Sequence, residues 1–237
     1  MFAITNPSES AINDAAKALI GGALVGIPTE TVYGLAADAE NEAAVARIYS
    51  VKGRPQDHPV IVHIGSVDYL NKWAINIPDY ALKLAKEYWP GPMTLILERS
   101  EIAKDFITGG QNTVGLRVPA HLTTLALLEE FHKLGGNGIA APSANRFGAV
   151  SPTNAEAVQS ELGESLDQSR DLIIDGGQSL VGVESTIIDC TGEFPSVLRP
   201  GAISEEMIST TTNLNINPKF EFQDLWISTI HPKQKYH

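Results

Sequence analysis

The sequence predicts an α/β protein built on a mixed sheet. Short apolar runs that are typical of buried strands alternate with longer segments whose apolar residues recur at helical spacing. Hydrophobic residues make up 43% of the 237 residues, which is enough for a sizeable core and too much for a disordered chain. The length suits one large domain, or one domain followed by a tail.

The first predicted elements are a helix and a buried strand. The alanine-rich segment 11–20 has helical spacing, with Ser10 as its expected N-cap and Gly21-Gly22 as its stop. Residues 23–27 then predict a short buried strand. The strand ends where a loop over 28–31 begins with a proline.

The remaining elements continue the alternation. Asn41 is the expected N-cap of a helix over 41–50, and the apolar run 59–64 predicts a buried strand. The other predicted elements are helices at 79–89, 122–134 and 153–162, the last capped by Ser151 or Thr153, and strands at 93–97, 113–118, 138–141, 172–175, 185–189 and 196–198. The pattern then weakens, so we expect a domain over 1–208 and a linker-like tail over 209–237.

Composition and charge exclude several classes of protein. The formal net charge of −11 argues against a protein that grips nucleic acid mainly through its phosphates. Cys190 is the only cysteine, so an internal disulfide is impossible and a cysteine-based zinc site is not expected. The first residues lack the pattern of a signal peptide, and no apolar run is long enough to span a membrane. We therefore expect a soluble, cytoplasmic protein.

Several conspicuous residues fit a structural role better than a functional one. Trp73, Trp89 and Leu82 are expected in the core, and Cys190, which follows a predicted strand, is expected to be inert. Asp175 and Asp189 could bind magnesium, but aspartates at strand ends are common turn residues.

Polar side chains gather at the ends of the predicted strands, where open α/β sheets collect their ligands. Besides the hydroxyls of segment 28–34, they are Lys52, Arg54, His63, Thr113, Arg117, Ser143, Asn145, Ser185, Thr186 and Arg199. Cations, hydroxyls and a histidine suit a triphosphate together with a small zwitterion. The chain has no Walker A sequence, dinucleotide glycine fingerprint or nucleophile elbow, so no catalytic residue is assigned and catalysis would rest on positioning and charge neutralisation.

Taken together, the segments that contain these residues resemble the threonylcarbamoyl-AMP synthases, the YrdC-like family. In chain order they are Pro-Thr-Glu-Thr-Val-Tyr-Gly-Leu at 28–35, Lys-Gly-Arg-Pro at 52–55, Pro-Val-Ile-Val-His-Ile at 59–64, Thr-Val-Gly-Leu-Arg-Val-Pro at 113–119, Ala-Pro-Ser-Ala-Asn at 141–145, Ser-Pro-Thr at 151–153, Glu-Ser-Thr-Ile at 184–187 and Leu-Arg-Pro-Gly at 198–201. Each segment is short, but the ordered set across 12–203 is specific. The likeness is to the catalytic domain of the longer two-domain members without their second domain, and the end of the tail, 228–237, resembles the family's linker only weakly.

The resemblance implies a twisted, open mixed sheet flanked by helices, with a large concave cavity. By family roles, threonine would be held by Thr31, His63, Arg117, Ala141 and Ser185. ATP would be held by Lys52, Arg54, His58, Thr113, Ser143, Asn145, Ser151 and Arg199. His58 stands where many relatives have asparagine, and both side chains can hydrogen-bond. No metal ligand is assigned, because magnesium is expected to arrive with ATP.

The activity that the resemblance implies joins L-threonine, bicarbonate and ATP into threonylcarbamoyl-adenylate and pyrophosphate. This product would serve the modification of tRNA next to the anticodon, with a downstream threonylcarbamoyl transferase as partner. Two alternatives stay open: a related module that makes another carbamoyl-adenylate, and a double-stranded RNA-binding accessory protein without catalysis. The acidic charge favours weak or absent tRNA binding.

Overall fold

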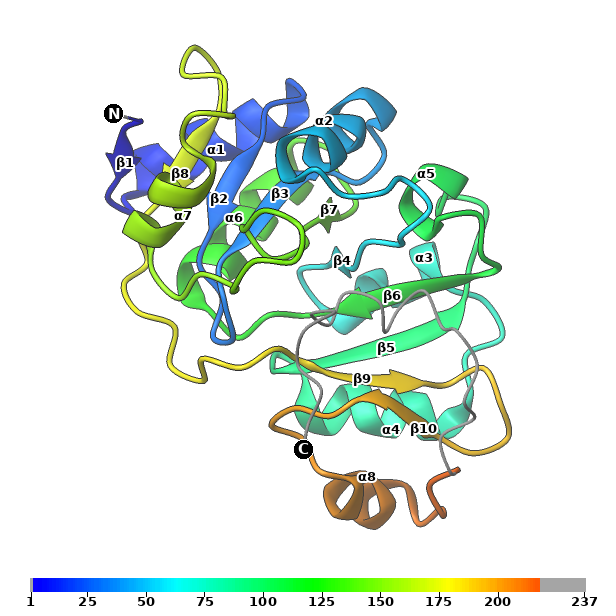
Figure 1. Cartoon of the computed structure of the whole chain (residues 1–237). Helices are drawn as coiled ribbons and strands as arrows, with labels where there is room; N and C mark the ends of the chain where they lie inside the picture. Colours follow the sequence, from blue (N-terminus) through cyan, green and yellow to red (C-terminus); the bar gives the residue numbers. More distant parts are fainter. Residues whose placement is uncertain (1, 218–237) are drawn as a thin grey trace.

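The computed structural model describes residues 2–217 and contains one ten-stranded sheet in the order β1-β8-β2-β3-β7-β4-β6-β5-β9-β10 (Figure 1). Four neighbouring pairs are parallel (β1–β8, β2–β8, β4–β6 and β5–β9), and the others are antiparallel. The predicted α/β class with a mixed sheet flanked by helices is therefore confirmed. The expected large cavity stays a prediction.

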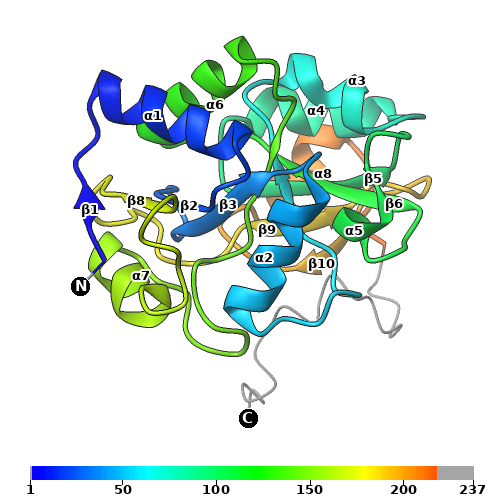
Figure 2. The same cartoon turned by 90° about the horizontal axis from the view of Figure 1, so that it is seen from above.

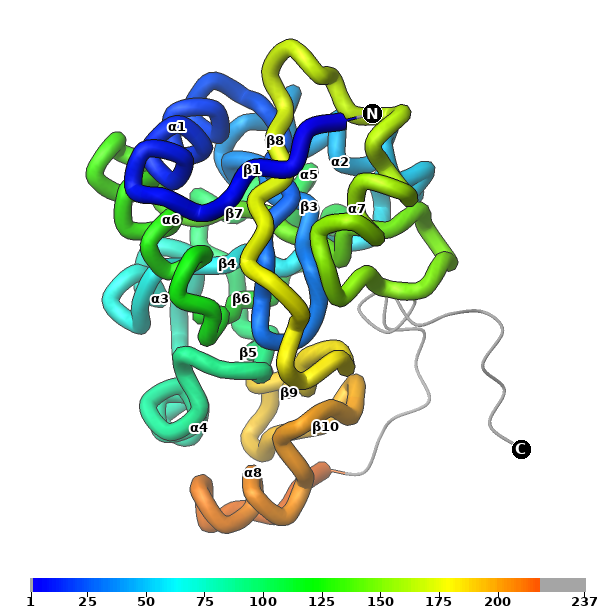
Figure 3. The backbone as a smooth tube through the Cα atoms, turned by 90° about the vertical axis from the view of Figure 1, so that its left-hand side faces the viewer, coloured from blue at the N-terminus to red at the C-terminus, as the bar shows by residue number. Residues whose placement is uncertain are grey.

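The strands are short, and most are buried. They are β1 (Ile4–Thr5), β2 (Val25–Ile27), β3 (Gly34–Asp38), β4 (Val62–His63), β5 (Met93–Glu98), β6 (Thr113–Arg117), β7 (Ile139–Ala140), β8 (Leu172–Ile174), β9 (Thr186–Asp189) and β10 (Ser196–Arg199). Figure 3 shows β1 running beside β8, although 167 residues separate their first positions. Within the run predicted at 59–64, only two residues pair as a strand.

The helices lie on both faces of the sheet. They are α1 (Glu9–Ile20), α2 (Glu42–Lys52), α3 (Leu70–Trp73), α4 (Asp79–Tyr88), α5 (Asp105–Thr108), α6 (Leu122–Lys133), α7 (Ala155–Leu162) and α8 (Glu205–Thr212), with a 3₁₀ turn at Val67–Tyr69. In Figure 2, α1, α6, α3 and α4 lie on one side of the strands, and α2, α5 and α7 lie on the other. No helix among residues 2–217 is long and apolar enough to cross a membrane.

Side-chain caps fix where several helices begin. Asn41 caps α2, as predicted, by accepting from the backbone N–H of Ala44 at 3.1 Å. Two other cap predictions are wrong. Ser8 rather than Ser10 caps α1, and Asn154 rather than Ser151 or Thr153 caps α7, in each case because its side chain reaches the N–H three residues ahead. Both errors place the helix start within a few residues of its true position, which is the usual uncertainty of helix ends.

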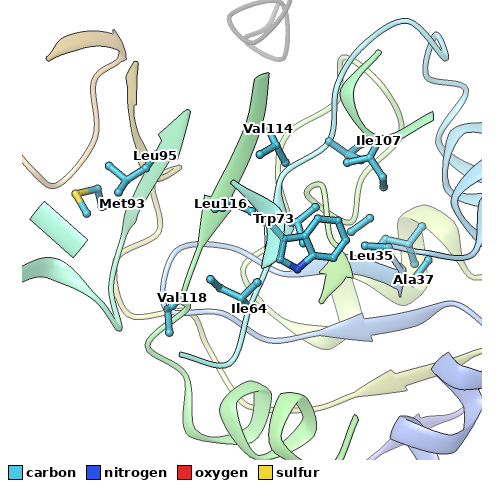
Figure 4. Packing of buried hydrophobic residues seen from close by; sticks show 14 of the residues in the cluster. Leu35, Ala37, Ile64, Trp73, Met93, Leu95, Ile107, Val114, Leu116 and Val118 are labelled. Atoms are coloured by element: carbon cyan, nitrogen blue, oxygen red, sulfur yellow. The ribbon is translucent and has the colours of Figure 1, made fainter. Parts of the chain in front are cut away.

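The largest hydrophobic cluster fills the space between the central strands and their helices. Trp73 is fully buried there, and its indole N–H donates to the Asn137 carbonyl at 3.1 Å (Figure 4). Trp89 is also buried, so the core predictions for both tryptophans are confirmed. The prediction for Leu82 is wrong because the buried face of α4 carries positions 80, 81, 84 and 85, and Leu82 points off it with 43% of its surface exposed.

The described part of the tail is ordered by packing. Helix α8 continues to Thr212, past the expected domain boundary at 208, and its partner is α4. The Tyr88 hydroxyl contacts Met207 and Thr211, while Leu214 packs against the main core. The rest of the predicted tail, 218–237, lies outside the described residues.

Candidate functional site

Two residues of the predicted threonine group are neighbours in the sheet. His63 on β4 is in register with Arg117 on the parallel strand β6. Residues in register on adjacent strands send their side chains to the same face, so the histidine and the arginine share one side of the sheet. Val118, the next residue, is buried in the core on the opposite side, as the alternation predicts (Figure 4).

The guanidinium of Arg117 is already paired within the protein. Its Nη2 lies 2.6 Å from Oε1 of Glu30, and its Nε donates to the carbonyl of Gly91 at 3.3 Å. The second carboxylate oxygen of Glu30 accepts from the backbone N–H of Ala120 at 3.0 Å. Among residues 2–217, Nη1 of Arg117 makes no hydrogen bond.

His63 is held in its neutral form. It is almost completely buried, and this burial, together with the nearby positive charge of Arg117, lowers the pKa of His63 to about 3. Within the described chain its Nδ1 has no hydrogen-bond partner. A neutral imidazole offers one donor and one acceptor, which suits a hydroxyl or an amine of a ligand.

The loop that carries Thr31 is fixed by its own hydroxyls. Thr29 Oγ1 donates to the carbonyl of Val32 at 2.6 Å and lies 2.9 Å from the hydroxyl of Thr31. Tyr33 anchors the end of the loop, because its hydroxyl donates to Gly177 O and accepts from Gly176 N. Side-chain bonds of this kind replace regular backbone pairing, so the loop keeps one conformation without forming a strand.

A second group surrounds Ser185 at the start of β9. The hydroxyl of Ser185 lies 2.8 Å from that of Thr94 and accepts from Nη2 of Arg199 at 2.9 Å. Arg199 also pairs with Glu184 at 3.6 Å, and Glu184 accepts from the hydroxyl of Ser151 at 2.7 Å. Ser185, from the predicted threonine group, therefore touches Arg199, from the predicted ATP group.

Lys52 ties the end of α2 to the loop after β7. Its Nζ donates to the carbonyl of Ser143 at 2.5 Å and to that of Asn145. The amide nitrogen of Asn145 donates to the carbonyls of Arg146 and Ala149, while its buried Oδ1 has no partner in the described chain. A buried acceptor without a partner is unusual, and a ligand donor would satisfy it.

Arg54 and His58 both lie against one aromatic ring. The guanidinium of Arg54 is 5.8 Å from the ring centre of Phe147, and the imidazole of His58 meets the same ring edge-on at 5.4 Å. Nη2 of Arg54 donates to Pro59 O at 2.8 Å. Among the described residues, its buried Nε has no partner.

One carboxylate is within electrostatic reach of three buried cations. Burial is the main cause of a lowered pKa in all three. It lowers the pKa of Lys52 to about 7, and it lowers the pKa values of Arg54 and Arg199 below their ordinary value. Glu184 opposes this shift in all three. Glu184 thus influences three cations that the sequence separates by up to 147 residues, and it contacts one of them, Arg199, directly.

Two predicted site residues have less direct connections. Ala141 follows β7, where its N–H donates to the carbonyl of Ile61, so it borders the strand that carries His63. Thr113 lies at the opposite end of β6 from Arg117, about 13 Å along the strand at 3.3 Å per residue. It lines a cavity of about 370 Å³, whose other lining residues are Asn76, Glu98, Arg99, Asn112, Cys190 and Thr191.

Glu30 and Glu184 are the site residues that sequence reasoning missed. Both stand inside the quoted segments, yet their roles depend on partners that only the fold brings near: Glu30 contacts Arg117 across 87 residues. Each pairs with one arginine, so two of the four buried cations of the site have a carboxylate partner. No group of three or more His, Cys, Asp or Glu side chains within residues 2–217 is arranged to hold a metal ion.

The remaining residues singled out in the sequence have contacts that suit the structural roles expected of them. Cys190 is buried, and burial raises the pKa of its thiol, which makes it unreactive. Asp189 accepts from the N–H and hydroxyl of Thr191, and Asp175 accepts from the N–H of Gly177, so both aspartates stabilise turns.

Comparison with known protein families finds one family over most of the chain. The Sua5/YciO/YrdC family model, described as "Telomere recombination", matches residues 17–201. Among curated proteins, the threonylcarbamoyl-AMP synthase of Pyrococcus abyssi is 46% identical over 211 residues, which cover 89% of this chain and 60% of that protein. The corresponding protein of Bacillus subtilis is 43% identical over 85% of this chain and 56% of its own length.

Solved structures agree with this result. The P. abyssi Sua5 structure complexed with L-threonine has a TM-score of 0.84 at 45% identity, covering 91% of this chain and 63% of that one. The chain thus spans about 60% of the length of these relatives.

A putative threonylcarbamoyl-AMP synthase of Mycobacterium tuberculosis is 37% identical and is covered to 87% of its own length.

Proposed function

This chain belongs to the Sua5/YciO/YrdC family, and on that premise we propose that it forms threonylcarbamoyl-adenylate from L-threonine, bicarbonate and ATP, with release of pyrophosphate. The observation that carries the proposal is the direct contact between the two predicted binding groups. Ser185 touches Arg199, so a small amino acid near Arg117 would lie beside a nucleotide near Arg199. The curated relatives with this name support the same activity.

The first part of the proposed site holds threonine. Nη1 of Arg117, which has no hydrogen bond in the described chain, would donate to the α-carboxylate of the amino acid. The hydroxyl of Thr31 and the neutral imidazole of His63 would recognise its hydroxyl or orient its amine. Ser185 and Ala141 would border the same space. The relative whose structure contains L-threonine supports this choice of amino acid.

The proposed reaction has two stages. The unprotonated threonine amine adds to the carbon of bicarbonate, which loses water and leaves a carbamate. One carbamate oxygen then attacks the α-phosphorus of ATP, and the bond to the β-phosphate oxygen breaks, so that pyrophosphate leaves. No nucleophile of the protein is needed, and the contribution of the chain is to hold both reactants at short distance and to offset charge.

The second part of the site meets the nucleotide. Lys52, Arg54 and Arg199 would offset the charge of the triphosphate as it breaks, and the hydroxyls of Ser143 and Ser151 would donate to its oxygens. Asn145, through its unpartnered Oδ1, and His58 would contribute further hydrogen bonds. The same group would include Thr113 only if the nucleotide extends along β6. Magnesium would enter bound to ATP, with phosphate and water oxygens as its main ligands.

The product is an activated carbamoyl group, so a transferase that passes it to tRNA must act afterwards. We propose that this partner and the site share the cytoplasm. A related module that makes another carbamoyl-adenylate would need a different first substrate. The buried Arg117 and neutral His63 favour an amino acid with a hydroxyl over a small uncharged donor.

The direct test is pyrophosphate release from ATP by the purified chain. We expect release only when threonine and bicarbonate are both present. Serine should substitute poorly, although the missing methyl group is worth only about 1–3 kcal/mol. Equal rates with glycine and threonine would contradict the proposed specificity, and release without any amino acid would contradict the reaction.

A further inference from the structure

Arg117 and Glu30 form an ion pair in which both side chains are nearly buried. Among the ion pairs of the described chain, it is the one with this burial that includes a residue of the proposed threonine site. The exposed fractions are 5% for Arg117 and 8% for Glu30. Replacement of a buried pair by apolar residues is often neutral or stabilising, so stability alone is a weak reason for its presence. The pair therefore calls for a functional explanation.

Glu30 is anchored on both sides. One carboxylate oxygen binds Arg117 and the other accepts from the N–H of Ala120, just before α6. Its backbone carbonyl accepts from Val181 N at 2.8 Å, and the preceding carbonyl, of Thr29, accepts from the hydroxyl of Ser179. A carboxylate fixed at this many points is suited to hold a partner in place.

The contacts of Glu30 decide which part of Arg117 a ligand can use. Glu30 and the Gly91 carbonyl occupy Nη2 and Nε, which fixes the plane of the guanidinium and leaves Nη1 without a hydrogen bond in the described chain. A flexible arginine would lose conformational freedom on binding its ligand. An arginine held in this way has already lost that freedom.

The pair also sets the charge that a ligand experiences. Arg117 contributes one positive charge and Glu30 one negative charge, 2.6 Å apart, so their sum is close to zero. A lone carboxylate placed on Arg117 adds a second negative charge beside Glu30. A zwitterion brings its own ammonium group close to both carboxylates and restores neutrality.

We propose that Glu30 is a positioning residue that orients Arg117. Through its negative charge, Glu30 also makes the site prefer an amino acid over the same carboxylic acid that lacks the amino group. This inference rests on the proposed threonine site. The competing explanation is that Glu30 has only a structural role and fixes the loop at residues 28–33 to the start of α6. Both explanations predict some loss of thermal stability when Glu30 is changed, so selectivity must be measured.

The experiment compares the binding of two ligands to the full chain. Equilibrium dialysis gives the affinity for labelled L-threonine, and displacement gives the affinity for (R)-3-hydroxybutyrate, which is threonine without its amine. Wild type should prefer threonine strongly. Glu30→Gln should weaken threonine binding at least tenfold and reduce the preference for threonine over hydroxybutyrate at least tenfold. ATP binding should change less than twofold.

Two further variants complete the design. Glu129→Gln removes an exposed carboxylate of α6 and should leave both affinities unchanged. Glu30→Asp keeps the charge but has a side chain one methylene shorter. It should weaken threonine binding and preserve the preference for threonine over hydroxybutyrate. This variant keeps the inference testable if the glutamine variant does not fold.

The outcomes separate this inference from the proposed function. Suppose that wild type binds threonine, and that Glu30→Gln lowers the melting temperature but leaves the preference for threonine over hydroxybutyrate unchanged. Glu30 then has only a structural role, and the inference is wrong. If wild type binds no threonine at all, the proposed function fails, and the inference fails with it.

Discussion

Arg117 shows how the fold can use some donors of a side chain and leave another without a partner in the described chain. Its Nε and Nη2 hold protein partners, and its Nη1 does not. The sequence singled out the arginine, because it lies at the end of a predicted strand and inside a segment that resembles the family. It could not predict Glu30 as partner, since nothing in the order Thr29, Glu30, Thr31 marks a contact with a residue so far along the chain.

The first prediction is that Arg117→Lys weakens threonine binding about ten- to a hundredfold. Lysine can keep the charge beside Glu30 but lacks the planar fork, so at least one charge-assisted hydrogen bond is lost, at a cost of about 1.5–3 kcal/mol. ATP binding should be nearly unchanged. Separate titrations of threonine and ATP against the purified variant measure this. A lower melting temperature with ordinary threonine affinity would assign Arg117 to strand stability instead.

The second prediction concerns Lys52. Burial of its ammonium group, together with the nearby charge of Arg54, lowers the pKa of Lys52 to about 7. Above that pH the free protein has lost this proton, whereas a bound triphosphate favours the protonated amine. ATP binding therefore takes up a proton, and ATP affinity should fall as the pH rises from 7 to 9, by at most about tenfold per pH unit.

The matched variant for this titration is Lys52→Arg, which stays protonated over the whole range. Its ATP affinity should be nearly independent of pH between 7 and 9. Calorimetry at three pH values, in buffers of different ionisation enthalpy, would detect the proton uptake directly. The same slope in both proteins would show that Lys52 is not the titrating group. His63 is not an alternative source, because it is neutral throughout this range.

At the scale of elements, long periodic segments were predictable and short ones were not. The helices α2, α4 and α6 have enough turns for their apolar spacing to be read. The strand β3 was missed because its sequence, Gly-Leu-Ala-Ala-Asp, has small residues and no β-branched ones, and its pairing with β2 and β7 decides its conformation. The four-residue helices α3 and α5 are too short for any period.

Helix α8 gives the third prediction. Cutting the chain after Ser209 removes the last turn of α8 together with Leu214 and Ile216, which pack against the core. Burial of such side chains contributes about 1.5–3 kcal/mol each when complete, so we expect a loss of roughly 2–5 kcal/mol in the free energy of unfolding. Urea denaturation measures it.

A cut after Asn217 is the matched control. Asn217 is the last described residue, and its N–H donates to the carbonyl of Pro195 at 2.9 Å, so this cut keeps every described contact of α8. The longer chain should unfold near the wild-type urea concentration. If the cut after Ser209 is equally stable, α8 contributes nothing measurable and the boundary expected at 208 is the better one.

At the scale of the molecule, charge is divided between the site and the surface. Among residues 2–217, four of the 14 basic residues (Lys52, Arg54, Arg117 and Arg199) are buried, as are two of the 26 acidic ones (Glu30 and Asp171), which leaves 10 basic and 24 acidic residues in this part of the chain. The four buried cations all belong to the candidate site, so the rest of residues 2–217 is more acidic than the total for this part of the chain suggests. The sequence gives the net charge but cannot show this division, because it depends on burial.

The last prediction follows from that division. A protein that neutralises many phosphates displaces condensed counterions from the nucleic acid, so its affinity depends steeply on salt. With more than twice as many acidic as basic residues outside the buried set of residues 2–217, we expect no retention of tRNA or of a double-stranded RNA in a gel-shift assay at about 150 mM salt. Pyrophosphate release, measured on the same preparation, should remain. Salt-dependent micromolar binding of either RNA, without pyrophosphate release, would instead favour the RNA-binding accessory protein, because such binding requires a basic face.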